Sequence, residues 1–304
     1  MKLAKAVKVC RIDKPEHFRL ADHDPSESFG LSTDIDDVKP VLADAIARLE
    51  KLQEDLYADG RWAVLVVLQG MDAAGKDGVV KHVMSGINPE GCDVYAFKAP
   101  SAEELGHDFL WRGAKVLPRR GTIGIFNRSY YEEVLVVRVH PKMLAAQKLP
   151  PDDTGKTIWK NRFKDIRAFE RRLARNGTLI LKFHLRISME EQRKRFLARL
   201  EEPAKRWKFS MNDVAERGYW NDYMAAYEEM IRETSTDYAP WYVVPAGHKH
   251  VAWLVVSAAI IGALEKLSPR PPQISGAKLK ELQAAERALR AEVPRKTKDS
   301  SGKR

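Results

Sequence analysis

The sequence predicts an α/β fold, a three-layer sandwich in which helices cover both faces of a central parallel sheet of about five strands. Two observations carry this prediction. Residues 62–68, 122–126 and 178–184 are mostly apolar and of strand length, which is typical of parallel strands buried on both faces. Stretches with helical periodicity separate these strands, as the crossover connections of a parallel sheet require.

The chain before the first strand divides into two parts. Residues 1–38 are rich in Asp, Pro and Ser, and we expect them to form an extended arm on the surface of the body. Residues 41–59 carry apolar side chains at helical spacing, which predicts an amphipathic helix covering one face of the sheet, and Gly60 is suited to cap its end. The main domain is expected to span residues 39–268.

The first strand runs directly into a phosphate-binding loop. Gly70 is followed after four residues by Gly75 and Lys76, where a helix is expected to begin and to run to about residue 87. Glycines let backbone N–H groups converge on an anion, the helix start adds its positive dipole end, and the lysine brings a mobile charge. We therefore predict nucleotide or phosphate contacts for these three residues and also for Asp77 and Gly78.

Two acidic residues distinguish this loop. A Ser or Thr that ligates magnesium usually follows the lysine, and here Asp77 takes that position. Asp72, inside the loop, supplies a carboxylate that ordinary loops of this kind do not need. The alternative is a Gly-rich turn with a solvated lysine, but the strand before it, the helix after it and the spacing favour phosphate binding.

The next segment returns the chain to the sheet. We expect a turn at residues 88–91, a strand at 94–97 and a helix at 101–115. Basic residues then gather where the chain re-enters the sheet: Arg112, Lys115, Arg119 and Arg120. They form either a solvated helix face or an anion-binding cluster near a strand end, and Arg112 and Arg119 are the candidates for phosphate contact.

The third predicted strand, residues 122–126, also ends in polar residues. Enzymes with a phosphate loop commonly place a carboxylate there to hold magnesium, whereas this chain has Asn127. An amide can orient a metal-bound water but has no charge, so Asp72, with Glu132 or Glu133, would have to carry the electrostatic part of metal binding. Asn127 itself is a candidate for nucleotide or phosphate contact. Arg128 is expected to point back toward the phosphates.

The rest of the domain supplies helices, a last strand and a lid. Helices are predicted at residues 155–176 and 188–201, with Ser188 starting a capping box. The last strand is predicted at residues 241–245, and a mostly buried helix follows from His248.

A basic break separates two of these helices. Residues 202–213 combine positive charge with aromatic side chains and precede a helix that reaches residue 234. Such a hinge has the properties of a lid that closes over phosphates and excludes water, here at about residues 203–222. The candidate contacts are Lys205, Arg206 and Lys208. A solvated turn between helices is the alternative.

Composition and charge narrow the class of partner. The chain has 304 residues, and a net charge of +10 from 52 Lys+Arg against 42 Asp+Glu favours a polyanion. Cys10 and Cys92 are the two cysteines, which suits a reducing compartment without disulfides. The sequence shows no signal-peptide pattern and no run of ~20 apolar residues. We expect a cytoplasmic protein with no membrane contact.

The domain is followed by residues 269–304. A polar helix is expected around residues 278–291, and a basic tail from 294 to 304 is expected to be disordered.

Three segments resemble the signature segments of the polyphosphate kinase 2 family. They are residues 70–78, residues 126–132, and residues 206–210 together with 219–223, and their order and spacing also match. The resemblance covers about residues 30–268. It implies a P-loop kinase-like fold with a helical lid. It also implies reversible transfer of the terminal phosphoryl group of inorganic polyphosphate to a nucleoside diphosphate, ADP or also GDP, with Mg²⁺ or Mn²⁺.

Roles follow from the resemblance by position. It implies that Asp72 orients the acceptor phosphate or the metal, that Lys76 binds the transferring phosphate, and that Arg128 balances charge, with Glu132 as the fourth catalytic candidate. The three basic lid residues would close over the nucleotide and polyphosphate. The family often has Asp where this chain has Asn127, so Asp72 is the predicted metal ligand. We also expect a homo-oligomer, a dimer or tetramer.

Three other functions are compatible with part of this pattern. A polyphosphate:AMP phosphotransferase would share every motif. An ATP-dependent nucleoside monophosphate kinase would share the loop and lid, but is expected to have Ser or Thr at position 77. A nucleic-acid-binding module would explain the charge, but its binding would survive loss of Lys76 and would depend steeply on salt. We expect no nucleic-acid partner.

Overall fold

The computed structural model describes residues 2–150, 155 and 157–292 of the chain. It divides into two compact units, Met1–Arg270 and Pro271–Arg304. In the second unit, α13 (Gly276–Ala291) is an exposed helix capped by Ser275, so the predicted polar helix is confirmed. The predicted basic tail lies outside the described residues.

Five parallel strands form one sheet in the order β2-β3-β1-β4-β5. Their bounds are β1 (Ala63–Gln69), β2 (Cys92–Ala96), β3 (Ile123–Asn127), β4 (Thr178–Arg186) and β5 (Trp241–Pro245). The chain places its next two strands on one side of β1 and its last two on the other. Ligands of open parallel sheets bind outside the carboxyl ends of the strands at such a switch point. The predicted α/β sandwich is confirmed.

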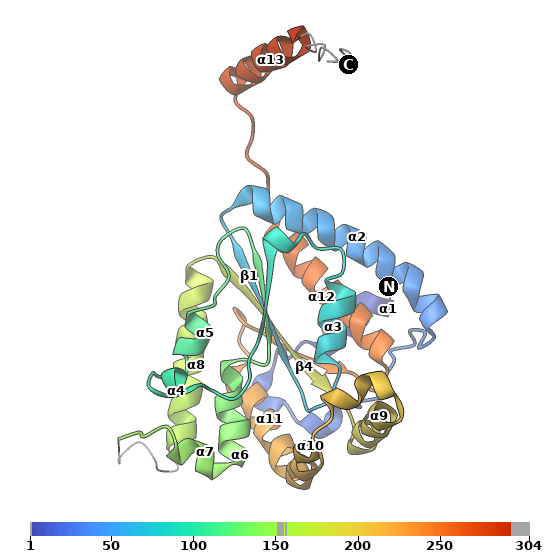
Figure 1. The fold of residues 1–304 in the computed structure, drawn as a ribbon, viewed down its shortest axis with the longest axis vertical. Helices are drawn as coiled ribbons and strands as arrows, with labels where there is room; N and C mark the ends of the chain where they lie inside the picture. Colours follow the sequence, from blue (N-terminus) through green and yellow to red (C-terminus); the bar gives the residue numbers. More distant parts are fainter. Residues whose placement is uncertain (1, 151–154, 156, 293–304) are drawn as a thin grey trace, which may run out of the picture. The chain divides into compact units, whose positions relative to one another are not determined.

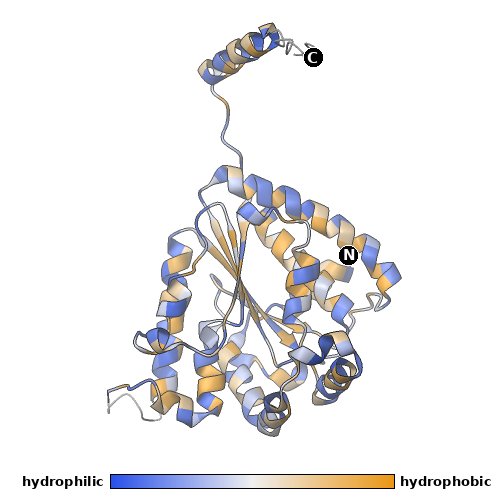
Figure 2. Cartoon of the chain, in the orientation of Figure 1, coloured by the Kyte–Doolittle hydropathy of each residue, from blue (hydrophilic) through white to orange (hydrophobic). Residues whose placement is uncertain are grey.

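Helices cover both faces of the sheet (Figure 1). One face carries α1 (Lys2–Cys10), α2 (Ile35–Asp59), α3 (Lys76–Val83) and α12 (Lys249–Leu267). The other carries α8 (Ile158–Arg175) and α11 (Trp220–Thr234). Alternate residues of β1 enter the two cores, Val64 and Val66 on one side and Leu65 and Val67 on the other, and Figure 2 shows the strands as a hydrophobic centre.

Shorter elements line the edge where the strands end. On the side of β2 and β3 these are α4 (Ala102–Leu105), α5 (Trp111–Ala114), η4 (Tyr130–Val134), α6 (Val136–Val139) and α7 (Pro141–Ala145). Helix α9 (Met189–Glu201) leads into the lid region, which consists of η6 (Pro203–Lys208), α10 (Met211–Glu216) and η7 (Arg217–Tyr219). The remaining single turns are η1 (Pro15–His17), η2 (Leu20–Asp22) and η3 (Pro89–Gly91).

Several predicted elements need correction. The amino-terminal arm is not simply extended, because α1 forms and buries Ala6 and Cys10 in the core. The helix predicted at residues 101–115 is broken into α4 and α5, since Gly106 ends the first and the side chain of Asp108 accepts a hydrogen bond from the backbone N of Leu110 (2.9 Å). The loop helix α3 ends at Val83, earlier than predicted.

The capping predictions are confirmed in part. Gly60 ends α2 in the left-handed conformation, with φ 63°, where a side chain would be strained. Ser188 caps α9 by accepting a hydrogen bond from the backbone N of Glu191 (3.0 Å). The second half of the predicted capping box is replaced, because the Glu191 carboxylate accepts from Arg195.

Helix α12 is a core element that packs against both the sheet and α2. It is long and apolar enough to cross a membrane by length and composition, but 61% of its apolar window is buried inside the fold. Its burial against α2 and the sheet explains this composition, since a helix that is hydrophobic on most sides is typical of a protein core.

A buried ion pair joins four elements on the other face of the sheet. Lys182 of β4 donates to Glu170 of α8 (2.7 Å), to the hydroxyl of Tyr131 in η4 (2.9 Å) and to the carbonyl oxygen of Thr234 at the end of α11 (2.7 Å). Glu170 also accepts from the hydroxyls of Tyr130 and Tyr131. Lys182 thereby fixes η4, which follows the polar end of β3.

We predict that Lys182→Met lowers the free energy of unfolding by ~3–5 kcal/mol, because it leaves Glu170 charged and buried without its cation. Denaturant unfolding measures this loss. The matched control is Lys51→Met, which removes an exposed i,i+4 partner of Asp55 and should change stability by less than ~0.5 kcal/mol. Equal effects of the two substitutions would contradict the role of the buried pair.

Candidate active site

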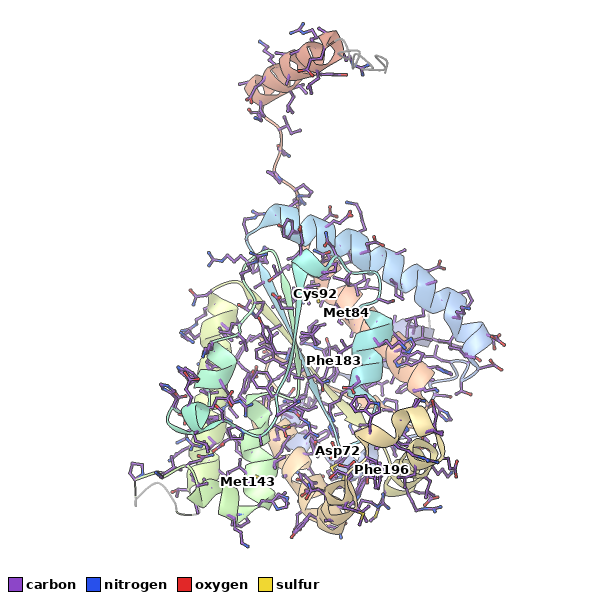
Figure 3. The ribbon with its side chains drawn as sticks, viewed as in Figure 1. Asp72, Met84, Cys92, Met143, Phe183 and Phe196 are labelled. Carbon is purple, nitrogen blue, oxygen red and sulfur yellow. The ribbon has the colours of Figure 1, made fainter. Side chains whose placement is uncertain are left out.

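The turn between β1 and α3 has the backbone of an anion-binding loop. Gly70, Ala73 and Gly75 all have positive φ, at 155°, 63° and 104°. A Cβ at position 70 would lie 2.6 Å from the carbonyl oxygen of Leu185, so a glycine is required there. The loop lies at the carboxyl edge of the sheet, where Asp72 is labelled in Figure 3. The predicted phosphate-loop geometry is therefore present.

Lys76 begins α3 and folds back over the loop. Its Nζ donates to the carbonyl oxygens of Gly70 (2.6 Å) and Met71 (3.1 Å), and the residue is 7% exposed. Burial, with the nearby Arg128 charge, lowers the pKa of Lys76 to about 8, against the opposing effect of three carboxylates. Lys76 therefore loses its proton at a lower pH than an ordinary lysine does. Its ammonium group points at carbonyl oxygens of its own loop.

Arg128 lies between two carboxylates at the end of β3. One guanidinium nitrogen donates to Asp72 of the loop, and the other donates to Glu132 of η4 (3.1 Å). Arg128 has a φ of 62°, a conformation that costs a residue with a side chain about 1–2 kcal/mol. Burial acts to lower the pKa of Arg128, but Glu132 and Asp72 outweigh it and raise the pKa. The structure therefore brings Asp72, Arg128 and Glu132 together, and their catalytic roles stay predictions.

Gln69 holds the carboxylate of Glu132 in place. It is fully buried at the end of β1, and with its amide nitrogen facing Glu132 it donates to that carboxylate (2.9 Å) while its oxygen accepts from Ser129 (3.0 Å). Glu132 therefore receives hydrogen bonds from both Arg128 and Gln69, which fixes its direction.

The residues at the edge of the loop offer oxygen ligands. Asn127 donates from its amide nitrogen to Asp77 (2.7 Å), which joins the end of β3 to the start of α3. Within the part of the chain that the structure describes, no group of three or more His, Cys, Asp or Glu side chains is arranged to hold a metal. Magnesium is typically held by one or two carboxylates together with substrate phosphates, so the single carboxylate of Asp72 in the loop fits this cation.

A pocket of about 350 Å³ adjoins the charged group on the side of β2. Its apolar lining comes from Phe97, Phe109, Val136, Val137 and Met143, with Met143 labelled on α7 in Figure 3. Arg128 and Glu132 stand at one of its walls. A pocket with apolar side chains and several polar and charged groups in its wall is suited to a ring system that carries a charged tail.

Arg112 also lines this pocket, whereas Arg119 does not. Arg112 donates to the carbonyl oxygen of Lys98 (2.8 Å) and lies over the Phe97 ring. Arg119 precedes β3 and donates to the carbonyl oxygen of Glu90 (3.4 Å), so it lies at the amino end of the strand, away from the loop. The prediction of a phosphate contact for Arg119 is wrong, because sequence proximity to a strand does not tell which end a residue joins.

Glu133 lines the same pocket, but its carboxylate is bonded to other partners than Arg128. Its carboxylate accepts from Arg162 (3.0 Å) and Gln147 (2.7 Å), and burial raises its pKa. Of the two carboxylates proposed as alternatives, Glu132 is the one that faces Arg128.

Two of the three basic lid residues have partners at the end of α9 and just after it. Lys205 pairs with Glu202 (2.5 Å), and Arg206 donates to the carbonyl oxygen of Leu200 (2.7 Å). Lys208 ends η6, and its side chain is outside what the structure describes. Their contact with phosphates therefore stays a prediction.

Two residues of α9 contact the loop and were not found from the sequence. Gln192 donates to the carbonyl oxygen of Asp72 (3.0 Å), and Arg195 donates to those of Ala73 (2.9 Å) and Ala74 (3.2 Å). They are three residues apart on one helix face, but about 120 positions from the loop in sequence. Helical spacing was the available signal, and it does not reveal the partner.

Comparison with known proteins agrees with this geometry. A family model described as polyphosphate kinase 2 matches residues 32–272. The chain is 55% identical over 243 residues to a Rhodopseudomonas palustris protein named ADP-polyphosphate phosphotransferase, covering 80% of this chain and 84% of that protein. It is 46% identical over 267 residues to a Meiothermus ruber protein named AMP/ADP-polyphosphate phosphotransferase, covering 88% and 96%.

A solved structure is similar as well. The crystal structure of polyphosphate kinase 2 from Arthrobacter aurescens TC1 superposes with a TM-score of 0.82 at 40% sequence identity, covering 94% of this chain and 97% of that chain. The likeness extends over nearly the whole chain, so it includes the sheet, the loop and the lid region.

We predict that anion binding at the loop weakens as the pH rises through about 8. Lys76 must be protonated to bind phosphate, and its pKa in the empty loop is about 8, so the apparent Kd for tripolyphosphate should rise ~tenfold between pH 7 and pH 9. Calorimetric titration measures this change.

Lys76→Met is the control for the pH series, because the ionisation of tripolyphosphate itself affects both proteins equally. The variant should bind more weakly and should lack the part of the pH dependence that belongs to the lysine. The same pH dependence in both proteins would show that Lys76 does not titrate in this range.

Proposed function

The chain belongs to the polyphosphate kinase 2 family, and from this premise we propose that it transfers the terminal phosphoryl group of inorganic polyphosphate to ADP, reversibly and in one direct step. The observation that carries the proposal is the position of Arg128. This residue is paired with Asp72 of the phosphate loop and also lines the apolar pocket. A donor phosphate over the loop and an acceptor phosphate at the mouth of the pocket would meet at its guanidinium group.

Polyphosphate is the donor that we assign to the loop. The converging N–H groups and Lys76 address phosphate oxygens, and Lys76 can leave the carbonyls of Gly70 and Met71 for a phosphate without crossing the site. We assign the nucleoside of ADP to the pocket, where Phe97 and Phe109 offer aromatic surface to a base. GDP should also be accepted.

The chain's own residues position and neutralise charge. Lys76 and Arg128 hold the transferring group from two sides, and Gln69 and Glu132 keep the guanidinium in place. The acceptor phosphate is largely ionised near neutral pH, so no general base is needed, and Glu132 is in any case committed to two hydrogen bonds. Mg²⁺, with Mn²⁺ as a substitute, would neutralise phosphate charge when held by Asp72.

AMP is the second acceptor to consider. The Meiothermus ruber relative is named for both AMP and ADP, and it covers 88% of this chain. The cytoplasm is the compartment that we propose, since it keeps thiols reduced and supplies nucleotides; Cys10 and Cys92 are both free here.

We predict that the purified protein forms ATP from ADP and polyphosphate with magnesium, and that Lys76→Ala abolishes this activity while the protein stays folded. The lysine supplies the mobile charge for the transferring phosphate, and nothing else in the loop replaces it. Chromatography of nucleotide products with ADP, GDP and AMP as acceptors measures the activity and ranks the acceptors.

Assays without polyphosphate separate the alternatives. An ATP-dependent nucleoside monophosphate kinase would convert ATP and AMP under these conditions, and such turnover together with inert polyphosphate would refute the proposal. Robust ATP formation by the Lys76→Ala protein would refute the role of the loop.

We predict that Asp72→Asn lowers kcat/KM by a factor on the order of 10² or more, because it removes the metal ligand and one partner of the partly buried Arg128. Asp77→Asn is the matched control at the exposed helix start and should have a milder effect, since an Asn can still accept from Asn127. Steady-state kinetics over a range of magnesium concentrations measure both. Equal losses would contradict this ranking.

A further inference from the structure

Arg195 of α9 is tied to the phosphate loop more fully than a surface charge would be. We infer that it is the positioning residue that holds the loop in its phosphate-binding shape, an inference that rests on the proposed function for the identity of the bound phosphate. Its hydrogen bonds go to backbone carbonyl oxygens and to Glu191. It acts through the backbone of the loop.

All five N–H groups of the Arg195 guanidinium have acceptors. Nη1 donates to the carbonyl oxygens of Ala73 (2.9 Å) and Ala74 (3.2 Å). Nη2 donates to those of Ala246 (2.5 Å) and Gly247 (3.1 Å) in the turn between β5 and α12. Nε donates to Glu191 (2.7 Å). One side chain thus joins the loop, the next turn of the sheet edge and α9.

The loop carbonyl oxygens that Arg195 binds are those expected to point away from an anion held by the loop. A loop whose N–H groups converge on a phosphate turns its carbonyl oxygens to the opposite side, where each needs a donor. Arg195 supplies donors to two of them, and Gln192 supplies one to Asp72 (3.0 Å). Three consecutive loop carbonyls are therefore held by one face of α9.

The guanidinium also adds charge behind the loop. A Cβ placed at Gly75 would lie 3.7 Å from Nη1 of Arg195, so the cation sits directly behind the start of α3. Its side chain is 20% exposed, which limits screening by solvent. The guanidinium thus places a cation close to the loop, and its partner Glu191 offsets part of that charge.

The same helix face is connected to the lid. Gln192 accepts a hydrogen bond from Arg217 of η7 (2.9 Å), and Arg217 also donates to the carbonyl oxygen of Met189 (3.0 Å). A lysine in place of Arg195 would keep the charge but could not reach five acceptors in three directions. The structure therefore assigns the loop's shape to the forked geometry of the guanidinium rather than to its charge alone.

The test compares Arg195→Lys with Arg193→Lys. Arg193 lies on the same helix, is exposed and pairs with Glu190, so it is a matched control outside the site. The expected result for Arg195→Lys is a loss in kcat/KM for polyphosphate on the order of 10², with an unchanged KM for ADP and a folded protein at the assay temperature. Arg193→Lys should behave as the wild type.

Two further measurements separate positioning from folding and from the proposed reaction. Guanidinium ion at millimolar concentration should restore part of the rate lost in Arg195→Ala. Calorimetric binding of tripolyphosphate with magnesium should weaken in Arg195→Lys even if the wild type makes no ATP, in which case the proposed function fails and the role of Arg195 stands.

Three results would overturn the inference. These are wild-type kinetics and tripolyphosphate binding in Arg195→Lys, equal losses in the Arg195 and Arg193 variants, or a loss of activity that matches the unfolded fraction in thermal melting.

Discussion

A backbone loop that turns its N–H groups toward an anion must turn its carbonyls away, and this constraint organises the active edge of the protein. The carbonyls of Gly70 and Met71 are covered by Lys76 from within the loop. Those of the following residues are covered by Gln192 and Arg195 from α9. The loop is consequently complete only when the helix that leads into the lid is packed against it.

The charged side chains next to the loop are also held in place by partners from several elements. Arg128 is held between Asp72 and Glu132, so the loop and the wall of the apolar pocket share one cation. The buried pair of Lys182 and Glu170 anchors η4 from the core side of the sheet. Donor and acceptor sites are therefore positioned by one continuous set of contacts at the carboxyl edge, and catalysis by positioning requires little further chemistry.

Local patterns in the sequence were sufficient to predict the strands of the sheet and the position of the phosphate loop. The last strand begins and ends where it was predicted, and the Gly-x4-Gly-Lys spacing placed the loop correctly, because both depend on neighbouring residues. Arg119 was assigned to the wrong edge, since a sequence does not show where a preceding loop crosses the sheet. The role of Arg195 was not predicted, because the loop carbonyl oxygens that it contacts are about 120 positions away in the sequence and a backbone acceptor does not depend on residue identity.

The central claim is that polyphosphate and ADP are bound together and that the phosphoryl group passes directly between them. Initial-rate kinetics with both substrates varied test this claim most directly. Double-reciprocal lines that intersect are the predicted result, because a loop and a pocket that share Arg128 form a ternary complex. Parallel lines, together with a phosphorylated protein isolated in the absence of ADP, would contradict it.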